Sequence, residues 1–288
     1  MDRSLWFKGE KWLVWTGILG FVLAVLCGVG VLVYGVEEFP GKGLVKAASF
    51  NAALGLFLIS TAAIIPLSGL GRIGRAVFRW SYIALGLFAY FAETVQNYRG
   101  VNPRFVEDGS AFDIAIANAF GTDAMLLVVF YVFLGAQFFR KRTYQLQPTV
   151  ITALRYAMIA IFASFMVGFW IGANQGRYIG LEGNLIWLHG MGFHALQALP
   201  FIAWLAVQGS MSEMGKRLVV HVSGVAFLFG LLAMGWQTYE GRTLAELSLF
   251  PLAALACYLV VTFAGVRALL EAVRGRNGSR PLHKGVGS

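Results

Sequence analysis

The sequence predicts an all-α fold, a polytopic bundle of about eight helices that cross a membrane. Apolar runs of roughly 20 residues recur along the chain, and a helix needs about 20 residues to span the hydrocarbon core. The chain is 58% hydrophobic and only 13% charged, whereas soluble domains carry about 25% charged residues. A transmembrane β-barrel would instead show alternating segments of about ten residues. We therefore expect a helical membrane protein that is embedded in the lipid bilayer.

Eight segments fit this description, and the connections between them are too short to hold a soluble domain. The expected spans are 12–35, 47–68, 78–98, 116–138, 152–174, 186–207, 218–238 and 247–270. The first span is longer than the apolar core of a signal peptide, so we expect it to be retained. The longest connection, from Tyr98 to about Ala115, contains Gly100, Pro103 and Gly109, and is typical of an external loop.

The basic residues follow the expected topology, which accounts for the net charge of +9. With the N-terminus inside, 17 of the 23 Lys and Arg residues fall in cytoplasmic segments, and a bias of this kind sets the orientation of multi-pass proteins. These 17 are Arg3, Lys8, Lys11, Arg72, Arg75, Arg79, Arg140, Lys141, Arg142, Arg155, Lys216, Arg217, Arg267, Arg274, Arg276, Arg280 and Lys284. Both termini are then cytoplasmic. No soluble basic domain gathers the charge, so we expect no nucleic-acid partner.

The two halves of the chain share a pattern that indicates a four-plus-four internal repeat. The third span ends Val95-Gln-Asn-Tyr-Arg-Gly100 and the seventh ends Trp236-Gln-Thr-Tyr-Glu-Gly241, at an offset of 141 residues. Four spans per half would make the repeat parallel, about an axis along the membrane normal. The alternative is two unrelated bundles whose helix ends share a Gln and a Gly. We expect one half at 1–145, the other at 146–275, and a disordered basic cytoplasmic tail at 276–288.

Two histidines in the sixth span are the first candidates for chemistry. His189 and His194 lie in the apolar stretch Leu185–Pro200, where ionisable side chains are costly and often functional. Five residues turn a helix by roughly 500°, which leaves the imidazoles about 140° apart, so they are not a ligand pair on one face. His194 and Gln197, three residues apart, do share a face. His194, with His189 and Gln197 nearby, is a candidate ligand for a transition metal or haem, or else a histidine that only hydrogen-bonds a neighbouring helix.

Other polar residues fall toward the same, predicted outer side of the membrane. These supporting candidates are Glu93, Gln96, Arg99, Asp123 and Gln237. Carboxylates within a membrane usually face a bundle interior or a water-filled cavity and have a partner, which for Glu93 would be Arg99 or Arg177. Asp123 is expected one or two turns into the fourth span, and Gln237 mirrors Gln96 in the second half. The alternative interpretation is that these groups are solvated helix ends or buried ion pairs.

Several classes of protein are not indicated by any motif. The sequence contains no Walker A motif, Rossmann fingerprint, Gly-x-Ser-x-Gly motif or Asp-rich pair, so nothing supports a nucleotide-driven pump. The two cysteines, Cys27 and Cys257, have neither zinc-site nor disulfide spacing.

The segment His189-Gly-Met-Gly-Phe-His-Ala-Leu-Gln-Ala-Leu-Pro200 resembles one found in a family of uncharacterised bacterial multi-pass membrane proteins, as do the two span ends quoted above. The resemblance covers spans three, six and seven and implies a bacterial plasma (inner) membrane protein, without implying an activity. The four-plus-four plan is also similar, at the level of the fold, to haem A synthase. That family places histidines on helices of both halves, whereas both candidate histidines here are in the second half.

Three hypotheses for the function follow. In the first, an outward-facing site of His, Glu, Asp and Gln side chains binds a metal or haem for redox chemistry or cofactor handling. In the second, the protein is a small-solute or proton-coupled transporter, for which buried titratable groups and repeated halves are typical. In the third, it is a non-catalytic assembly partner whose polar groups hold helices together. Whether it is an enzyme is left open.

Overall fold

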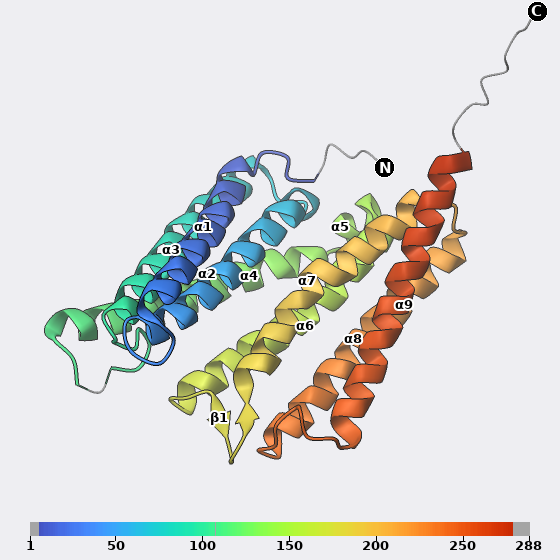
Figure 1. The fold of residues 1–288 in the computed structure, drawn as a ribbon. Helices are drawn as coiled ribbons and strands as arrows, with labels where there is room; N and C mark the ends of the chain where they lie inside the picture. Colours follow the sequence, from blue (N-terminus) through green and yellow to red (C-terminus); the bar gives the residue numbers. More distant parts are fainter. Residues whose placement is uncertain (1–5, 107, 279–288) are drawn as a thin grey trace, which may run out of the picture. The chain divides into compact units, whose positions relative to one another are not determined.

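The computed structural model describes residues 6–106 and 108–278, and within them the chain is almost entirely helical (Figure 1). The helices are α1 (Lys11–Tyr34), α2 (Gly41–Ile64), the short 3₁₀ helix η2 (Ile65–Leu67), α3 (Arg72–Tyr98), α4 (Ala111–Phe138), α5 (Lys141–Leu146), α6 (Pro148–Ala173), α7 (Leu185–Gln208), α8 (Glu213–Tyr239) and α9 (Leu249–Gly278). The two-residue strands β1 (Tyr178–Ile179) and β2 (Gly183–Asn184) pair antiparallel just before α7. The all-α prediction is confirmed.

Seven of these helices are long and apolar enough to cross a membrane: α1, α2 with η2, α4, α6, α7, α8 and α9. The fold is therefore that of a multi-pass membrane protein in contact with a lipid bilayer. Helix α3 has the necessary length, 27 residues, but carries Arg72, Arg75, Arg79 and Glu93 among its apolar residues. The eight-span count accordingly stays a prediction.

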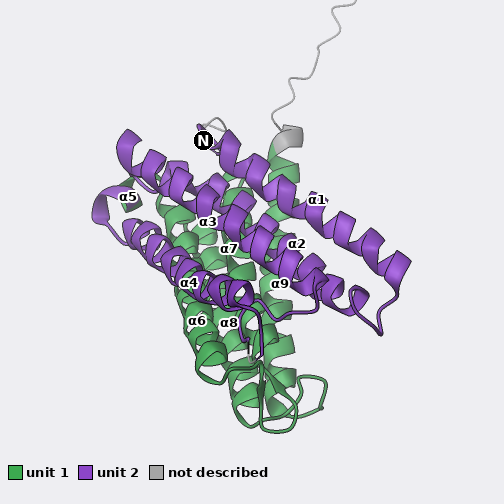
Figure 2. Ribbon diagram, turned by 90° about the vertical axis from the view of Figure 1, so that its left-hand side faces the viewer, with its two compact units in different colours: residues 1, 144–288 green, residues 2–143 purple. Residues whose placement is uncertain are grey.

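The chain divides into two compact units, each with its own packed helices and coloured separately in Figure 2. We call residues 2–143 the N-terminal unit and residues 144–288 the C-terminal unit; the boundary falls within α5. Residues 279–288, most of the predicted tail, lie outside the described residues, and α9 is helical up to Gly278.

The N-terminal unit is built on α3. Helix α3 packs against α1, α2 and α4, and α1 and α2 lie along each other. Its core contains large side chains that are almost fully buried, among them Leu58, Phe78, Tyr82 and Tyr131. Three of these are aromatic, and the rings of Phe78 and Tyr82 stack with centroids 4.7 Å apart.

The C-terminal unit is built on α7, which packs against α6, α8 and α9. The backbones of α6 and α7 approach closely at Gly192 of α7, because a Cβ atom there would lie 2.7 Å from the carbonyl oxygen of Ala160 on α6. Small residues at a helix interface let two backbones approach in this way. The sequence places Gly190 two residues away, and a Cβ atom at Gly190 would meet nothing within 4 Å.

Five helices begin four to six residues earlier than the apolar runs suggest: α2, α3, α4, α6 and α8. Helix starts are fixed by caps, which need not coincide with the edge of the apolar run. Ser110 caps α4 in a capping box with Asp113, and the Ser212 side chain accepts a hydrogen bond from the backbone N–H of Gly215 at the start of α8. Pro148 occupies the first turn of α6, where its missing N–H is not needed.

Candidate functional site

The two predicted histidines lie on α7 and have separate environments. The Nδ1 atom of His189 lies 2.7 Å from the backbone oxygen of Ser164 on α6, and its ring packs edge-on against Phe193. His194 is exposed, with Nδ1 3.3 Å from Oε1 of Gln197. His189 thus contacts the neighbouring helix, whereas His194 pairs with the residue that shares its face of α7.

A metal centre needs several ligands within reach of one ion. Among the described residues, no group of three or more His, Cys, Asp or Glu side chains is placed to hold a metal ion. The first hypothesis therefore rests on the three residues that were named from the sequence, His189, His194 and Gln197.

Glu93 of α3 is 1% exposed and has two polar partners. Its Oε1 forms an ion pair with Arg104 of the α3–α4 loop, and its Oε2 accepts a hydrogen bond of 2.9 Å from Nδ2 of Asn97. The expected pairing of Glu93 with Arg99 is wrong, because Arg99 pairs with Asp113; the alternative partner, Arg177, belongs to the C-terminal unit and stays a prediction. Arg104 reaches Glu93 because the loop folds back over the end of α3.

Arg99 instead belongs to a second cluster at the same end of the N-terminal unit. Its Nη1 lies 2.5 Å from Oδ1 of Asp113 and 2.6 Å from Oε1 of Gln96. Gln96 is buried and donates a hydrogen bond of 3.0 Å to the same Asp113 oxygen. The second oxygen of Asp113 accepts from both the backbone N–H and the hydroxyl of Ser110, so this one carboxylate joins the end of α3 to the start of α4.

Asp123 lies deeper in α4 than the sequence suggests. Because α4 begins at Ala111, Asp123 is more than three turns into the helix, about 18 Å from its start at 1.5 Å per residue. Its side chain is 5% exposed, and its Oδ2 atom has no hydrogen-bond partner within residues 6–106 and 108–278. The prediction of one or two turns is therefore wrong, since it took the edge of the apolar run for the start of the helix.

Hydroxyl groups are buried in the same unit. The Tyr82 hydroxyl donates to the backbone oxygen of Leu127 on α4 at 3.2 Å, and Asp123 interacts electrostatically with Tyr82. Thr61 of α2 donates to the Tyr131 hydroxyl at 3.4 Å. The hydroxyl of Tyr90 is buried on α3 and, in the described part of the chain, makes no hydrogen bond. These tyrosines were not among the sequence candidates, because a tyrosine in an apolar span gives no pattern by which to single it out.

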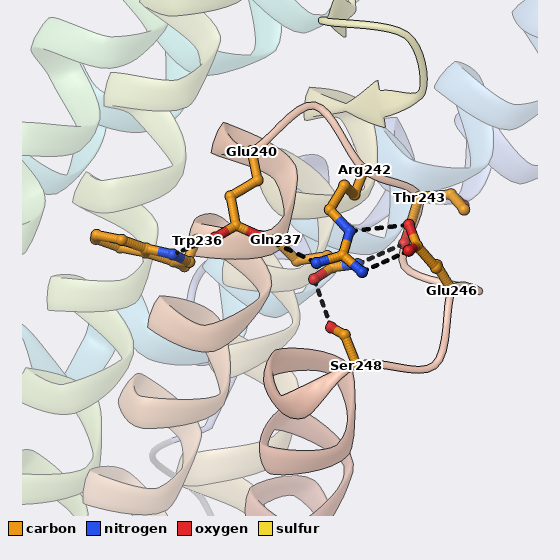
Figure 3. A network of polar contacts seen from close by, with 7 residues as sticks. All are labelled: Trp236, Gln237, Glu240, Arg242, Thr243, Glu246 and Ser248. Carbon is orange, nitrogen blue, oxygen red and sulfur yellow. Dashed lines mark hydrogen bonds and ion pairs between the residues drawn. The ribbon is translucent and has the colours of Figure 1, made fainter.

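Gln237 is buried at the end of α8, in the C-terminal unit, and fastens the α8–α9 loop (Figure 3). Its Nε2 donates to the backbone oxygen of Thr243 at 3.0 Å, and its Oε1 accepts from the Ser248 hydroxyl at 2.8 Å. Gln237 therefore holds the loop against the helix end and uses both ends of its amide to do so.

The loop itself is organised by Arg242, which Figure 3 shows between the carboxylates of Glu240 and Glu246. Arg242 Nε donates to Glu246 at 3.0 Å, and this guanidinium holds the pKa of the Glu246 carboxyl below its ordinary value. Trp236 Nε1 donates to Glu240 at 2.8 Å. Because these groups are exposed, the cluster sets the shape of the loop and adds little stability.

The predicted site residues are divided between the two units. Glu93, Gln96, Arg99 and Asp123 belong to the N-terminal unit, and His189, His194, Gln197 and Gln237 to the C-terminal unit. Reasoning from the sequence missed Arg104, Asp113, Tyr82 and Tyr90 as members of the polar set. The signal for Asp113 was present, because Ser110-x-x-Asp113 has the spacing of a capping box.

Comparison of the chain with protein-family models, with curated proteins and with solved structures finds no match. The class of protein, an integral multi-pass membrane protein, therefore follows from the helices themselves.

Proposed function

We propose that the protein moves protons across its membrane together with a small solute, and that the N-terminal unit carries the proton on Asp123. The observation that carries the proposal is the position of Asp123, almost fully buried near the middle of α4 and with one oxygen unpartnered in the described residues. Ionisable groups within membrane spans are rare, and they mark ion pathways and proton relays.

The chemistry of such a carboxyl suits proton movement. In apolar surroundings it is stable as a neutral acid, or as a carboxylate once a cation lies beside it. The hydroxyls of Tyr82, Tyr90 and Tyr131 are buried in the same unit, and each hydroxyl can both donate and accept a hydrogen bond. Tyr82 interacts electrostatically with Asp123, so its hydroxyl is the group that we expect to exchange a proton with this carboxyl.

The transport test uses proteoliposomes that contain a pH-sensitive dye, with an inward pH gradient, the membrane potential clamped, and the organic cation methylguanidinium on both sides as the probe solute. The wild-type chain should acidify the vesicles faster than protein-free lipid does. Asp123→Asn should reduce that protein-dependent rate by at least about tenfold, since a positioned proton-transfer group contributes about 10²–10⁴-fold to a rate. Asp108→Asn is the matched control, because Asp108 is an exposed carboxylate of the α3–α4 loop. Equal rates for Asp123→Asn and wild type, or for wild type and empty vesicles, would refute the proposal.

A second candidate function, metal or haem binding for redox or cofactor handling, is favoured by one contact of His189. Its Nδ1 lies against the backbone oxygen of Ser164, and hydrogen bonds of this kind orient imidazoles that bind metals through the other nitrogen. This candidate predicts a Soret band or near-stoichiometric metal in the purified protein, lost on His189→Ala or His194→Ala. A visible spectrum in both redox states with elemental analysis checks it, and a colourless, metal-free folded protein would rule it out.

We also infer that the two halves are a parallel four-plus-four repeat. Helices α3 and α8 each have 27 residues, and both their starts and their ends are 141 residues apart. Beyond each end, the backbone makes the same bond, from Val101 N–H to the Gln96 carbonyl and from Arg242 N–H to the Gln237 carbonyl. Gly100 and Gly241, which lie just before Val101 and Arg242, both have positive φ, 77° and 73°. Only glycine adopts this conformation without strain.

A second pair of contacts supports the repeat. A Cβ atom at Gly43, at the start of α2, would lie 1.9 Å from the carbonyl oxygen of Asn97, and one at Gly183, just before α7, would lie 2.4 Å from that of Thr238. Asn97 and Thr238 are again 141 residues apart in the sequence. In both units, then, the same turn of the helix end is closed by a glycine backbone.

A further inference from the structure

We propose that Phe50, Glu93 and Phe120 form a binding site for a small monovalent organic cation, a guanidinium or alkylammonium compound, and that Arg104 of the chain itself occupies it in this structure. We call these three side chains the cation site. That the cation is the solute which moves with the proton rests on the proposed function; the binding of the cation does not.

The cation site is contributed by three helices. The Cζ atom of Arg104 lies 5.5 Å from the ring centre of Phe50 on α2 and 5.3 Å from that of Phe120 on α4. The two ring centres are 6.2 Å apart, with the planes inclined at 54°. Glu93 of α3 completes the site through its ion pair with the same guanidinium. Aromatic faces together with a carboxylate are the groups with which proteins recognise organic cations.

Arg104, which occupies the cation site, lies in the α3–α4 loop and not on one of the three helices that form the site. Arg104 is 38% exposed while its partner Glu93 is 1% exposed, so the guanidinium enters the site from its open side. The helices also pack directly on one another, because Phe120 of α4 lies in a buried cluster with Ala89 and Ala92 of α3. Arg104 can therefore withdraw without dismantling the bundle, but its withdrawal leaves a buried carboxylate unpaired.

An unpaired buried carboxylate is strongly unfavourable, and this decides the charge of what replaces Arg104. Asn97 fixes the orientation of Glu93 with its hydrogen bond to Oε2, leaving Oε1 directed at the incoming cation. Lys46 also interacts electrostatically with Glu93, and a second positive charge on the ligand would be repelled by it. The site thus favours a monovalent cation with an apolar or flat surface that can rest on the rings.

Arg104 acts as a tethered competitor of any free cation. A group on a short flexible tether has an effective concentration in the millimolar range. A free cation of equal intrinsic affinity must exceed that concentration to displace Arg104 from the wild-type chain, whereas a chain without the Arg104 side chain should bind it at lower concentration.

The test uses the purified full-length chain in detergent, with methylguanidinium chloride as the probe and sodium chloride at equal ionic strength as the reference. Arg104→Ala should melt at a lower temperature than wild type, and methylguanidinium should raise its melting temperature saturably. The double variant Arg104→Ala/Glu93→Gln should lose that increase. Arg75→Ala is the matched control, because the Nε atom of Arg75 donates to the backbone oxygen of Leu70 and not to a carboxylate, and it should gain nothing from methylguanidinium.

Hydrogen–deuterium exchange of the wild-type chain gives a second measurement that does not depend on the folding of any variant. High methylguanidinium should accelerate amide exchange in residues 99–106 as the probe displaces Arg104, and sodium chloride should not. Absence of both effects, or equal stabilisation of Arg104→Ala and its Glu93→Gln double variant, would overturn the site. Saturable stabilisation of Arg104→Ala by methylguanidinium together with absent proton flux in the wild type would instead retain the site and refute the transport function.

Discussion

Replacing Gly192 by valine should destabilise the C-terminal unit by about 3 kcal/mol, the upper part of the range for overpacking a close interface. A Cβ atom at this position would lie 2.0 Å from Oγ of Ser164 and 2.7 Å from the carbonyl oxygen of Ala160. The Ser164 side chain can rotate away, but the Ala160 oxygen belongs to the backbone of α6. Helices α6 and α7 must therefore separate, and with them His189 and the Ser164 oxygen that it contacts.

Gly190→Val is the matched control for this prediction, because it makes the same change on the same helix two residues away. A Cβ atom at Gly190 meets nothing within 4 Å, so the melting temperature should stay close to that of wild type. Gly192→Val should lower it by roughly 10 °C, given the usual relation between stability and melting temperature for domains of this size. Equal melting temperatures for the two variants would show that α6 and α7 are not packed at Gly192.

The sequence was a good guide to the helices for a simple physical reason. Each long apolar run must be buried or placed in lipid, and a helix satisfies its backbone within the run. The runs therefore predicted the all-α bundle and the approximate position of every long helix. They did not predict the helix starts, because Ser110, Pro148 and Ser212 begin helices in polar sequence before the apolar residues.

The polar contacts were harder to predict. Glu93 was recognised as a buried carboxylate in need of a partner, but the partner, Arg104, comes from a loop whose path no periodicity describes. Gln96 and Arg99 were both named as polar candidates on the outer side, but Asp113, which contacts both of them, comes from the next helix. The metal or haem site on His189 and His194 stays a prediction. Side-chain contacts between different helices and loops depend on the tertiary fold, and the pattern of a single sequence does not reveal them.

Arg79 shows the same limitation and leads to the second large effect. From the sequence it is one of the cytoplasmic basic residues that orient the chain, but the structure gives it a bidentate contact with Glu10. Its Nε and Nη2 atoms donate to the two carboxylate oxygens at 2.7 and 3.1 Å. Glu10 is 0% exposed, and it is the residue that precedes α1. The pair therefore fastens the start of α1 to α3 within the N-terminal unit.

Arg79→Ala should destabilise the protein by about 3–5 kcal/mol, because it leaves the Glu10 carboxylate buried without its cation. The double variant Glu10→Ala/Arg79→Ala should recover part of the loss, since it removes the stranded charge together with its partner. Arg75→Ala is the matched control on the same helix: the Nε atom of Arg75 donates to the backbone oxygen of Leu70, and the variant should lose less than about 1 kcal/mol.

Melting of the four proteins in one detergent measures these differences. A double variant no more stable than Arg79→Ala would mean that the loss comes from packing of the arginine stem and not from the unpaired carboxylate. If Arg79→Ala instead melts like Arg75→Ala, Glu10 must reach water or another cation once Arg79 is gone. The contact would then contribute to the orientation of the chain in the membrane but little to its folding, because a charge that can be rehydrated costs little to unpair.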